Sequence, residues 1–165
     1  MKELKGYDLD NAIATRAVRL FLERWRKKYK KSVRHWLVTE LGHGTTEHLH
    51  LHGIIWCDDV NEIEKIWGYG YVWKGNIVNG KLENYVSART VNYIVKYITK
   101  VDSQHMNFKC KVLCSAGIGK GFIDSGHDKR NKFAGAKTKE DYRLDNGFKL
   151  NMPIYFRNKI YSEKE

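Results

Sequence analysis

The segment EHLHLHGIIW, residues 47–56, places a histidine at every second position and a leucine at each position between. Because side chains alternate across a β-strand, this spacing predicts a strand with imidazoles on one face and leucines on the other. The apolar face is suited to pack on a helix, which leaves the imidazoles on the opposite face of a sheet. The alternating histidines are His48, His50 and His52.

A second strand is predicted directly before the first. RHWLVTELG, residues 34–42, has a strand pattern, and the short polar connection HGTT joins it to the histidine segment. An antiparallel pairing through this loop brings Glu40 beside His50 and His52. Two imidazoles and a carboxylate can bind a divalent ion such as Mg²⁺ or Mn²⁺, with open positions for a substrate oxygen. We favour this metal site over surface or satisfied core histidines, and leave open whether His48 joins it.

Helices are predicted around these strands. Apolar residues recur every four positions in residues 10–30, and DDVNEIEKIWG has the pattern of a short helix capped by Asp58 or Asp59. The glycine-rich, aromatic residues 69–86 indicate a hairpin or surface excursion, and residues 87–100 a further helix. The resulting fold class is α+β, an antiparallel sheet with helices packed on one face and the active site on the other.

The helix predicted at residues 87–100 carries two tyrosines four positions apart, each followed three residues later by a lysine. On a helix, Tyr93, Tyr97, Lys96 and Lys100 share one side, and an apolar half of Val91, Ile94, Val95 and Ile98 forms the core face. A phenol with a pKa of about 10 is a poor nucleophile unless an ammonium and a metal-polarised phosphate assist it. An ordinary amphipathic helix with buried tyrosine rings and solvated lysines explains this segment equally well on its own.

The charge balance favours a polyanionic partner. Thirty Lys and Arg against nineteen Asp and Glu give a net charge of +11 in a chain of 165 residues. Nucleic acid is the first candidate, because ten tyrosines and five tryptophans interleave with the basic residues and can stack on unpaired bases. Residues expected to contact phosphate are Lys74, Arg89, Lys96, Lys100 and Lys120.

Other classes of protein fit poorly. No apolar run approaches the roughly 18 residues that span a bilayer, and the N-terminal MKELKGYDLDN lacks the apolar core of a signal peptide, so we expect a cytoplasmic protein without a membrane partner. Three cysteines in such a chain argue against a disulfide framework. The pair in CKVLC lacks a second pair to complete a zinc site, and we interpret all three as ordinary thiols. The GxGxG in AGIGKGF is weak evidence for phosphate binding.

The two constellations together resemble the HUH family of single-strand DNA endonucleases. HLH at His50–His52 combined with YIVKYITK at Tyr93–Lys100 is similar to the two-tyrosine rolling-circle replication initiators, particularly those of microviruses of the gokushovirus type. The resemblance runs over residues 15–160. Further stretches that carry it are TELG, VNYIVKYITK, SAGIGKGFI and MPIYFRNKIY.

This resemblance implies a role for each motif. His50 and His52 would be metal ligands, completed by the upstream acid Glu40. Tyr93 and Tyr97 would be alternating nucleophiles, and Lys96 and Lys100 would neutralise phosphate charge or assist the hydroxyls. The activity implied is nicking of single-stranded DNA at a replication origin, through a 5′-phosphotyrosine and a free 3′-hydroxyl that the host replication machinery extends. A divalent metal, Mg²⁺ or Mn²⁺, is the implied cofactor, and the host bacterial cytoplasm the implied location.

The sequence departs from the family at two points. Relatives usually carry an earlier strand with an F-x-T-L-T-like motif, and here the N-terminal residues lead almost at once into the first helix. We therefore expect a single HUH endonuclease domain over residues 1–165 whose first strand is missing or degenerate. His48 stands where relatives often have arginine.

Three alternatives stay open at this stage. An HUH relaxase or transposase uses related chemistry, although the order of histidines before tyrosines favours an initiator. A DNA-binding module could carry a vestigial metal site. A zinc-stabilised RNA-binding protein would need its metal to fold.

Overall fold

The computed structural model describes a chain that divides into two compact units, Met1–Ser115 and Ala116–Glu165. Each unit is described by itself. The first unit combines a small antiparallel sheet with helices, which confirms the α+β class predicted from the sequence. The expectation of a single domain over residues 1–165 stays a prediction. The residues described are 4–43, 47–99, 102–123, 125, 133–134, 137–138, 141–143, 149–151 and 154–160.

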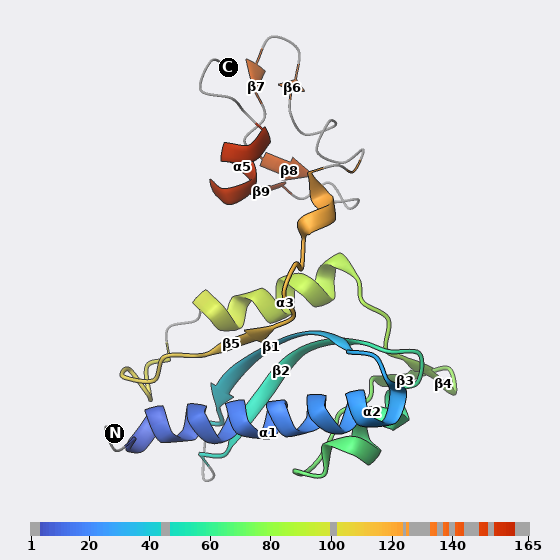
Figure 1. The fold of residues 1–165 in the computed structure, drawn as a ribbon. Coiled ribbons are helices and arrows are strands. Elements are labelled where there is room, and N and C mark those ends of the chain that lie inside the picture. The colour runs from blue at the N-terminus through green and yellow to red at the C-terminus, as the bar shows by residue number, and fades with distance from the viewer. Residues whose placement is uncertain are drawn as a thin grey trace. The chain divides into compact units, whose positions relative to one another are not determined.

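The order of elements follows the predicted one closely (Figure 1). None of the helices among the described residues is long and apolar enough to cross a membrane. The first unit contains α1 (Gly6–Tyr29), β1 (Arg34–Leu41), β2 (Leu49–Trp56), α2 (Val60–Trp67), β3 (Asn76–Val78), β4 (Lys81–Glu83), α3 (Ala88–Thr99) and β5 (Val112–Cys114). The second contains the 3₁₀ turn η1 (Lys120–Phe122), β6 (Phe133–Ala134), β7 (Lys137–Thr138), β8 (Asp141–Arg143), β9 (Lys149–Asn151) and α5 (Ile154–Ile160).

The central sheet has the strand order β2-β1-β5, and both pairings are antiparallel. β1 and β2 are the two strands predicted from the sequence, and they pair as expected through the loop between them. In their register Glu40 lies opposite His50, and Val38 lies opposite His52. Residues directly opposite each other in an antiparallel pair point to the same face. The register therefore places the acid and both imidazoles on one side of the sheet.

Helices cover both faces of the sheet, with α1 on one side and α3 on the other (Figure 1). The sequence-based expectation of helices on one face only was wrong on this point. The physical reason is that the imidazole face also carries apolar residues that must be kept from water. Val38 and Ile54 are buried there against Ile94 of α3, with Trp36 and Tyr97 packed around them.

The opposite face is packed by α1. Its buried residues are Ala14, Val18, Phe21 and Trp25, whereas Ile13, expected on the apolar stripe, is 58% exposed. The buried stripe is therefore rotated by one residue from the four-residue series read from the sequence. α1 starts earlier than predicted, and Lys30 ends it in the left-handed conformation, donating its N–H to the Arg26 carbonyl.

A buried threonine joins three segments of the first unit. Thr39 of β1 is fully buried, and its hydroxyl donates to the Asn11 side chain of α1 at 2.7 Å. The same oxygen accepts from the backbone N–H of Lys111, just before β5, at 2.7 Å. Each polar group is satisfied by another, so the hydroxyl can be buried without a large penalty.

α2 is fixed at its first turn and against α1. Asp59 caps the helix, accepting from the N–H of Asn61 at 2.9 Å, which settles the predicted choice between Asp58 and Asp59. Glu62 accepts hydrogen bonds from Lys28 and Tyr29 of α1 and from Lys65. These donors stabilise the carboxylate and lower the pKa of Glu62 to about 2. The hairpin predicted after α2 is β3-β4, turned by Asn79 and Gly80.

Gly53 occupies the middle of β2, opposite Leu37 of β1. A Cβ added there would lie 2.1 Å from the Trp36 carbonyl oxygen and 2.7 Å from the Leu37 Cα. Both are backbone atoms that cannot move without breaking the strand pairing. The glycine in HLHGII is therefore required by the close approach of the two strands that carry the site.

The contacts of Glu62 make stability depend on pH. Because the folded pKa is depressed below the ordinary 4.5, the stabilisation is present above pH 4.5 and is lost as pH falls through about 2. We expect Glu62→Gln to lower the melting temperature at neutral pH, and the gap to wild type to close on acidification. Melting curves from neutral pH to pH 2, with the exposed Glu23→Gln as control, measure this. A gap that stays constant with pH would contradict it.

Substitution of Gly53 should disrupt the β1-β2 pairing. We expect Gly53→Ala to reduce the free energy of unfolding by at least about 2 kcal/mol, because the added methyl overlaps backbone atoms. Gly121→Ala is the matched control, since a Cβ at Gly121 meets nothing within 4 Å. It should stay within about 0.5 kcal/mol of wild type in urea unfolding. Equal effects for the two variants would refute the steric explanation.

Candidate functional site

The acid and one imidazole predicted as metal ligands are in direct contact. His52 Nε2 lies 2.8 Å from Glu40 Oε2, and both side chains are largely shielded from solvent. His50 is exposed at the adjacent position, with its ring centroid 6.2 Å from that of His52. His48 precedes β2 and is exposed. The register of β1 and β2 thus brings Glu40, His50 and His52 to one edge of the same face.

α3 brings both tyrosines to this face. The Tyr97 ring stacks on the His52 ring, with centroids 4.2 Å apart and the planes inclined by 15°. The Tyr97 hydroxyl donates to the Tyr93 hydroxyl at 2.7 Å. Tyr97 packs into the apolar cluster with Ile94, while Tyr93 is 50% exposed. A continuous series of contacts therefore leads from Glu40 through His52 and Tyr97 to Tyr93.

The helix meets the sheet through a different side from the one predicted. Of the apolar half expected to form the core face, Ile94 is buried, whereas Val91, Val95 and Ile98 are about two-fifths exposed, at 40%, 44% and 42%. Tyr97 takes their place in the core. The tyrosines therefore do not lie opposite the packing side, and one of them contributes to the packing itself.

Lys96 lies beside both phenols. Its ammonium is 4.0 Å from the centroid of the Tyr93 ring and 5.4 Å from that of Tyr97. A cation in this position interacts favourably with the ring faces and would stabilise a phenolate. Lys100, assigned to the same role from the sequence, lies outside the described residues.

Burial raises the pKa of the Tyr97 phenol well above its ordinary value. The hydrogen bond to Tyr93 and the negative charge of Glu40 raise this pKa further. Tyr97 is thus held in its neutral form, as a hydrogen-bond donor to Tyr93. The two phenols occupy different environments, which the sequence could not distinguish because both have the same spacing to a lysine.

The donor set on the sheet face fits a divalent ion in kind. One carboxylate and two imidazoles suit a first-row metal. In the part of the chain that the structure describes, their ligand atoms are not all gathered within 4.8 Å of one another. His50 lies opposite Glu40 in the register, so a change of its side-chain rotamer would bring its imidazole toward the other two.

A second group of potential ligands does meet that distance, and the sequence analysis missed it. The ligand atoms of His43, Asp102 and His105 all lie within 4.8 Å of one another, so this group could hold a metal ion. His43 follows β1, and the other two follow α3. The hydrogen bond to Asp102 raises the pKa of His105. The D-x-x-H spacing of Asp102 and His105 was a signal, but nothing in the sequence linked it to His43.

The basic residues predicted to contact DNA are distributed differently. Lys74 is engaged with α2, 2.6 Å from Glu64 and 3.2 Å from the Asn61 side chain. Arg89 is exposed in the first turn of α3, the helix that carries the tyrosines. Arg89 is therefore the better placed of the two for an interaction with DNA near the candidate site.

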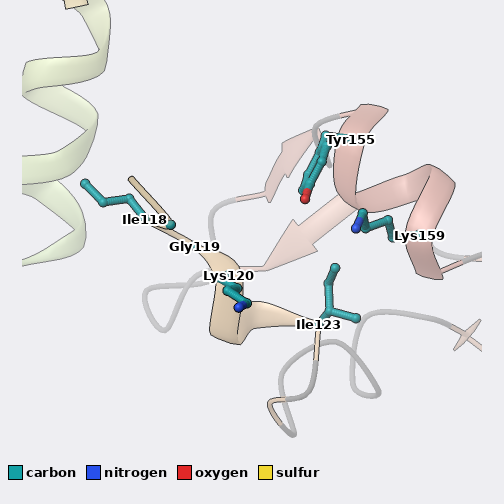
Figure 2. A pocket seen from close by; sticks show the side chains of 7 residues that line it. Ile118, Gly119, Lys120, Ile123, Tyr155 and Lys159 are labelled. Carbon is teal, nitrogen blue, oxygen red and sulfur yellow. The ribbon is translucent and has the colours of Figure 1, made fainter. Parts of the chain in front are cut away.

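Lys120 belongs to the second unit. It lines a cavity of about 720 Å³ with Tyr155 and Lys159 of α5 (Figure 2). Gly119 sits closely against the Phe156 ring, where a Cβ would lie 3.1 Å from the ring edge. The glycine-rich segment thus packs on α5, and the helix that directly follows it in the described residues is a single 3₁₀ turn. This differs from the long helix that binds phosphate in nucleotide-binding loops.

Comparison with known families gives a match over residues 6–102, to the family of the replication-associated protein ORF2. The chain belongs to this family. The match spans β1, β2 and α3, and so includes every predicted ligand and nucleophile. No curated protein and no solved structure gives a significant match.

Membership of this replication-associated family implies a role in initiating rolling-circle replication of a phage with a single-stranded DNA genome. The resemblance identified from the sequence is confirmed at this level. The assignment to microviruses of the gokushovirus type, and the roles of individual residues, stay predictions.

The contact between Glu40 and the tyrosine pair can be tested by titration of the metal-free protein. We expect Glu40→Gln to lower the pKa of Tyr97 toward the ordinary 10, because a nearby negative charge is removed. NMR of ¹³C-labelled tyrosine rings, assigned with Tyr97→Phe, follows this titration. Glu64→Gln, on α2, is the control and should leave it unchanged. If Tyr97 titrates together with exposed tyrosines in wild type, the described environment is wrong.

Proposed function

We propose that the protein is a metal-dependent, sequence-specific single-stranded DNA endonuclease and ligase of the HUH type. It nicks the replication origin of a phage genome through a 5′-phosphotyrosine intermediate and thereby initiates rolling-circle replication. The observation that carries this proposal is the contact series from Glu40 through His52 and Tyr97 to Tyr93 on one face of the sheet. The family match independently supports the biological role.

Glu40, His50 and His52 would hold the metal ion. When bound, a divalent ion polarises the scissile phosphate by withdrawing charge from a non-bridging oxygen. The protein's own part is to fix the carboxylate and imidazoles on paired strands and to hold the tyrosines beside them. Because Tyr97 stacks on His52, the nucleophile helix and the ligand strand are positioned by the same contact.

Tyr93 is the better candidate for the first cut. Its oxygen accepts the hydrogen bond from Tyr97, which stabilises a phenolate on Tyr93, and Lys96 adds a positive charge nearby. Tyr93 is also half exposed, whereas Tyr97 is packed against His52. The Tyr93 oxygen would form a bond to phosphorus as the bond from phosphorus to the 3′-oxygen breaks. The phenolic proton passes to solvent, and the leaving oxygen takes up a proton from water.

Tyr97 would make the second cut. Once Tyr93 carries the DNA as a phosphate ester, Tyr97 is the remaining free phenol on the same side of α3. After one round of extension from the 3′-hydroxyl by the host replication machinery, Tyr97 would attack the regenerated junction. The newly released 3′-hydroxyl would then attack the Tyr93 ester and close a circle. Each step exchanges one phosphate ester for another, so no nucleotide cofactor is consumed.

The electrostatic and aromatic surface supports a single-stranded substrate. A net charge of +11 favours phosphate binding that weakens steeply with salt. Tyr71 and Trp73 are 84% and 62% exposed between α2 and the β3-β4 hairpin, where unpaired bases could stack on them. Arg89 and Lys96 supply positive charge on the tyrosine helix.

One observation favours a second candidate function. The ligand atoms of Glu40, His50 and His52 are not all within 4.8 Å of one another among the described residues. A DNA-binding module with a vestigial metal site would be compatible with this spacing. A relaxase or transposase that uses a single tyrosine is less compatible with two phenols joined by a 2.7 Å hydrogen bond.

Covalent adduct formation distinguishes these functions. Oligonucleotides that tile the single-stranded DNA encoding this chain, labelled at the 3′ end, are incubated with the protein and Mn²⁺. We expect an SDS-resistant adduct that Tyr93→Phe abolishes and that Tyr97→Phe retains without joining of a second strand. His52→Ala should slow adduct formation at least roughly 100-fold, through loss of a metal ligand.

The matched control is Tyr155→Phe, which removes an exposed phenol in the second unit and should leave the adduct unchanged. An adduct that persists in the Tyr93→Phe, Tyr97→Phe double variant would refute the assignment of the nucleophiles. Binding without any adduct, with or without metal, would instead favour the DNA-binding module.

A further inference from the structure

His43, Asp102 and His105 converge from two segments that are far apart in the sequence. Asp102 Oδ2 lies 2.7 Å from His105 Nδ1 and 3.9 Å from His43 Nε2. One carboxylate oxygen therefore faces one nitrogen of each imidazole. Around a tetrahedral zinc ion with ligand bonds of about 2.0–2.1 Å, ligand atoms are separated by roughly 3.3 Å. Shifts of well under 1 Å at each side chain would reach that arrangement.

The outer nitrogen of each imidazole is occupied by an acceptor oxygen. His43 Nδ1 lies 2.6 Å from the Gln104 side-chain oxygen, and His105 Nε2 lies 3.4 Å from Glu47 Oε1. A metal-binding histidine almost always donates its other ring N–H to a carboxylate or carbonyl, which directs the remaining lone pair at the metal. Both imidazoles here have that pattern, with the remaining nitrogen directed at Asp102.

The carboxylate is oriented in the same way. Asp102 Oδ1 accepts from the backbone N–H groups of Gln104 and His105 at 3.0 and 3.1 Å. These bonds hold one oxygen and leave Oδ2 to face the two imidazoles. His105 is 4% exposed, with Tyr7 of α1 packed against it edge to face, so the position is rigid and largely dry.

We propose that His43 Nε2, Asp102 Oδ2 and His105 Nδ1 bind a structural zinc ion, separate from the Glu40, His50 and His52 site. Two imidazole nitrogens favour zinc over Mg²⁺ or Ca²⁺, which prefer all-oxygen ligands. A water molecule completes the fourth position. This proposal does not rest on the proposed endonuclease activity, because none of its ligands is assigned a part in that reaction.

The location gives the ion a mechanical role. His43 follows β1, which carries Glu40, and Asp102 follows α3, which carries the tyrosines. An ion shared between them ties the end of the tyrosine helix to the end of the ligand hairpin. It would thereby supplement the packing of Ile94 and Tyr97 that holds α3 on the sheet. Release of the ion should loosen α3 relative to β1 and β2.

Metal stoichiometry and spectra test the proposal on the full chain. The chelated protein is titrated with Zn²⁺, and with Co²⁺ as a coloured substitute, and bound metal is measured after dialysis. We expect Asp102→Asn to lose one equivalent of tight binding that wild type has, with affinity weakened at least roughly 100-fold. The lost Co²⁺ spectrum should lack thiolate-to-metal charge transfer, which excludes the cysteines. Zn²⁺ should raise the melting temperature of wild type but not of Asp102→Asn.

Other variants separate this site from its alternatives. His43→Gln alters a partly exposed residue and should lose the same equivalent if Asp102→Asn proves poorly folded by circular dichroism. His48→Gln is the matched control for a histidine in the same hairpin and should keep it. His50→Ala with His52→Ala should also keep it, even if the endonuclease proposal fails. Wild type and Asp102→Asn binding Zn²⁺ equally, or wild type binding none, would overturn the proposal and leave a hydrogen-bonded cluster only.

Discussion

The antiparallel pairing of β1 with β2 determines where every candidate ligand lies. Its register sets Glu40 opposite His50 and Val38 opposite His52. Because side chains alternate along a strand, a slip of one residue would move the imidazoles to the face covered by α1. Gly53 allows the close approach of the strands, and Thr39 fixes β1 to its neighbours on the other face. The chemistry of the site therefore depends on backbone pairing before it depends on any side chain.

The same sheet face has to serve two purposes, and α3 reconciles them. Val38 and Ile54 require cover from solvent, while the imidazoles beside them require access to a substrate. Ile94 and Tyr97 provide the cover, and Tyr97 also provides the stacking contact to His52. Tyr93, one turn earlier, extends beyond the packed region and remains half exposed. The two phenols thus differ in burial and in proton affinity although they belong to one repeated sequence motif.

This asymmetry bears on how one molecule could cut twice. A donor phenol and an acceptor phenol at 2.7 Å form an ordered pair in which one oxygen is favoured as the anion. Esterification of that oxygen would change the environment of the other. Two equivalent, solvent-exposed tyrosines would have no such order. The difference arises from the way in which α3 docks on the sheet, and it gives the two-tyrosine arrangement a physical basis for sequential use.

The sequence by itself determined the elements and their faces. Period-two alternation at residues 47–56 and apolar periodicity in the helices are local signals, so β1, β2, α2 and α3 were predictable, as was the pairing that brings Glu40 to the histidines. The family resemblance was equally local, because it rests on short motifs, and those that carry the predicted ligands and nucleophiles lie within the match over residues 6–102. Only the tertiary structure decided which side of α3 meets the sheet, and hence that Tyr97 is packed and Tyr93 exposed. It also decided that helices cover both faces and that His43 meets Asp102 and His105. These outcomes depend on contacts between segments separated by many residues. Such contacts are selected by the total apolar area buried and the hydrogen bonds satisfied, which no local pattern records.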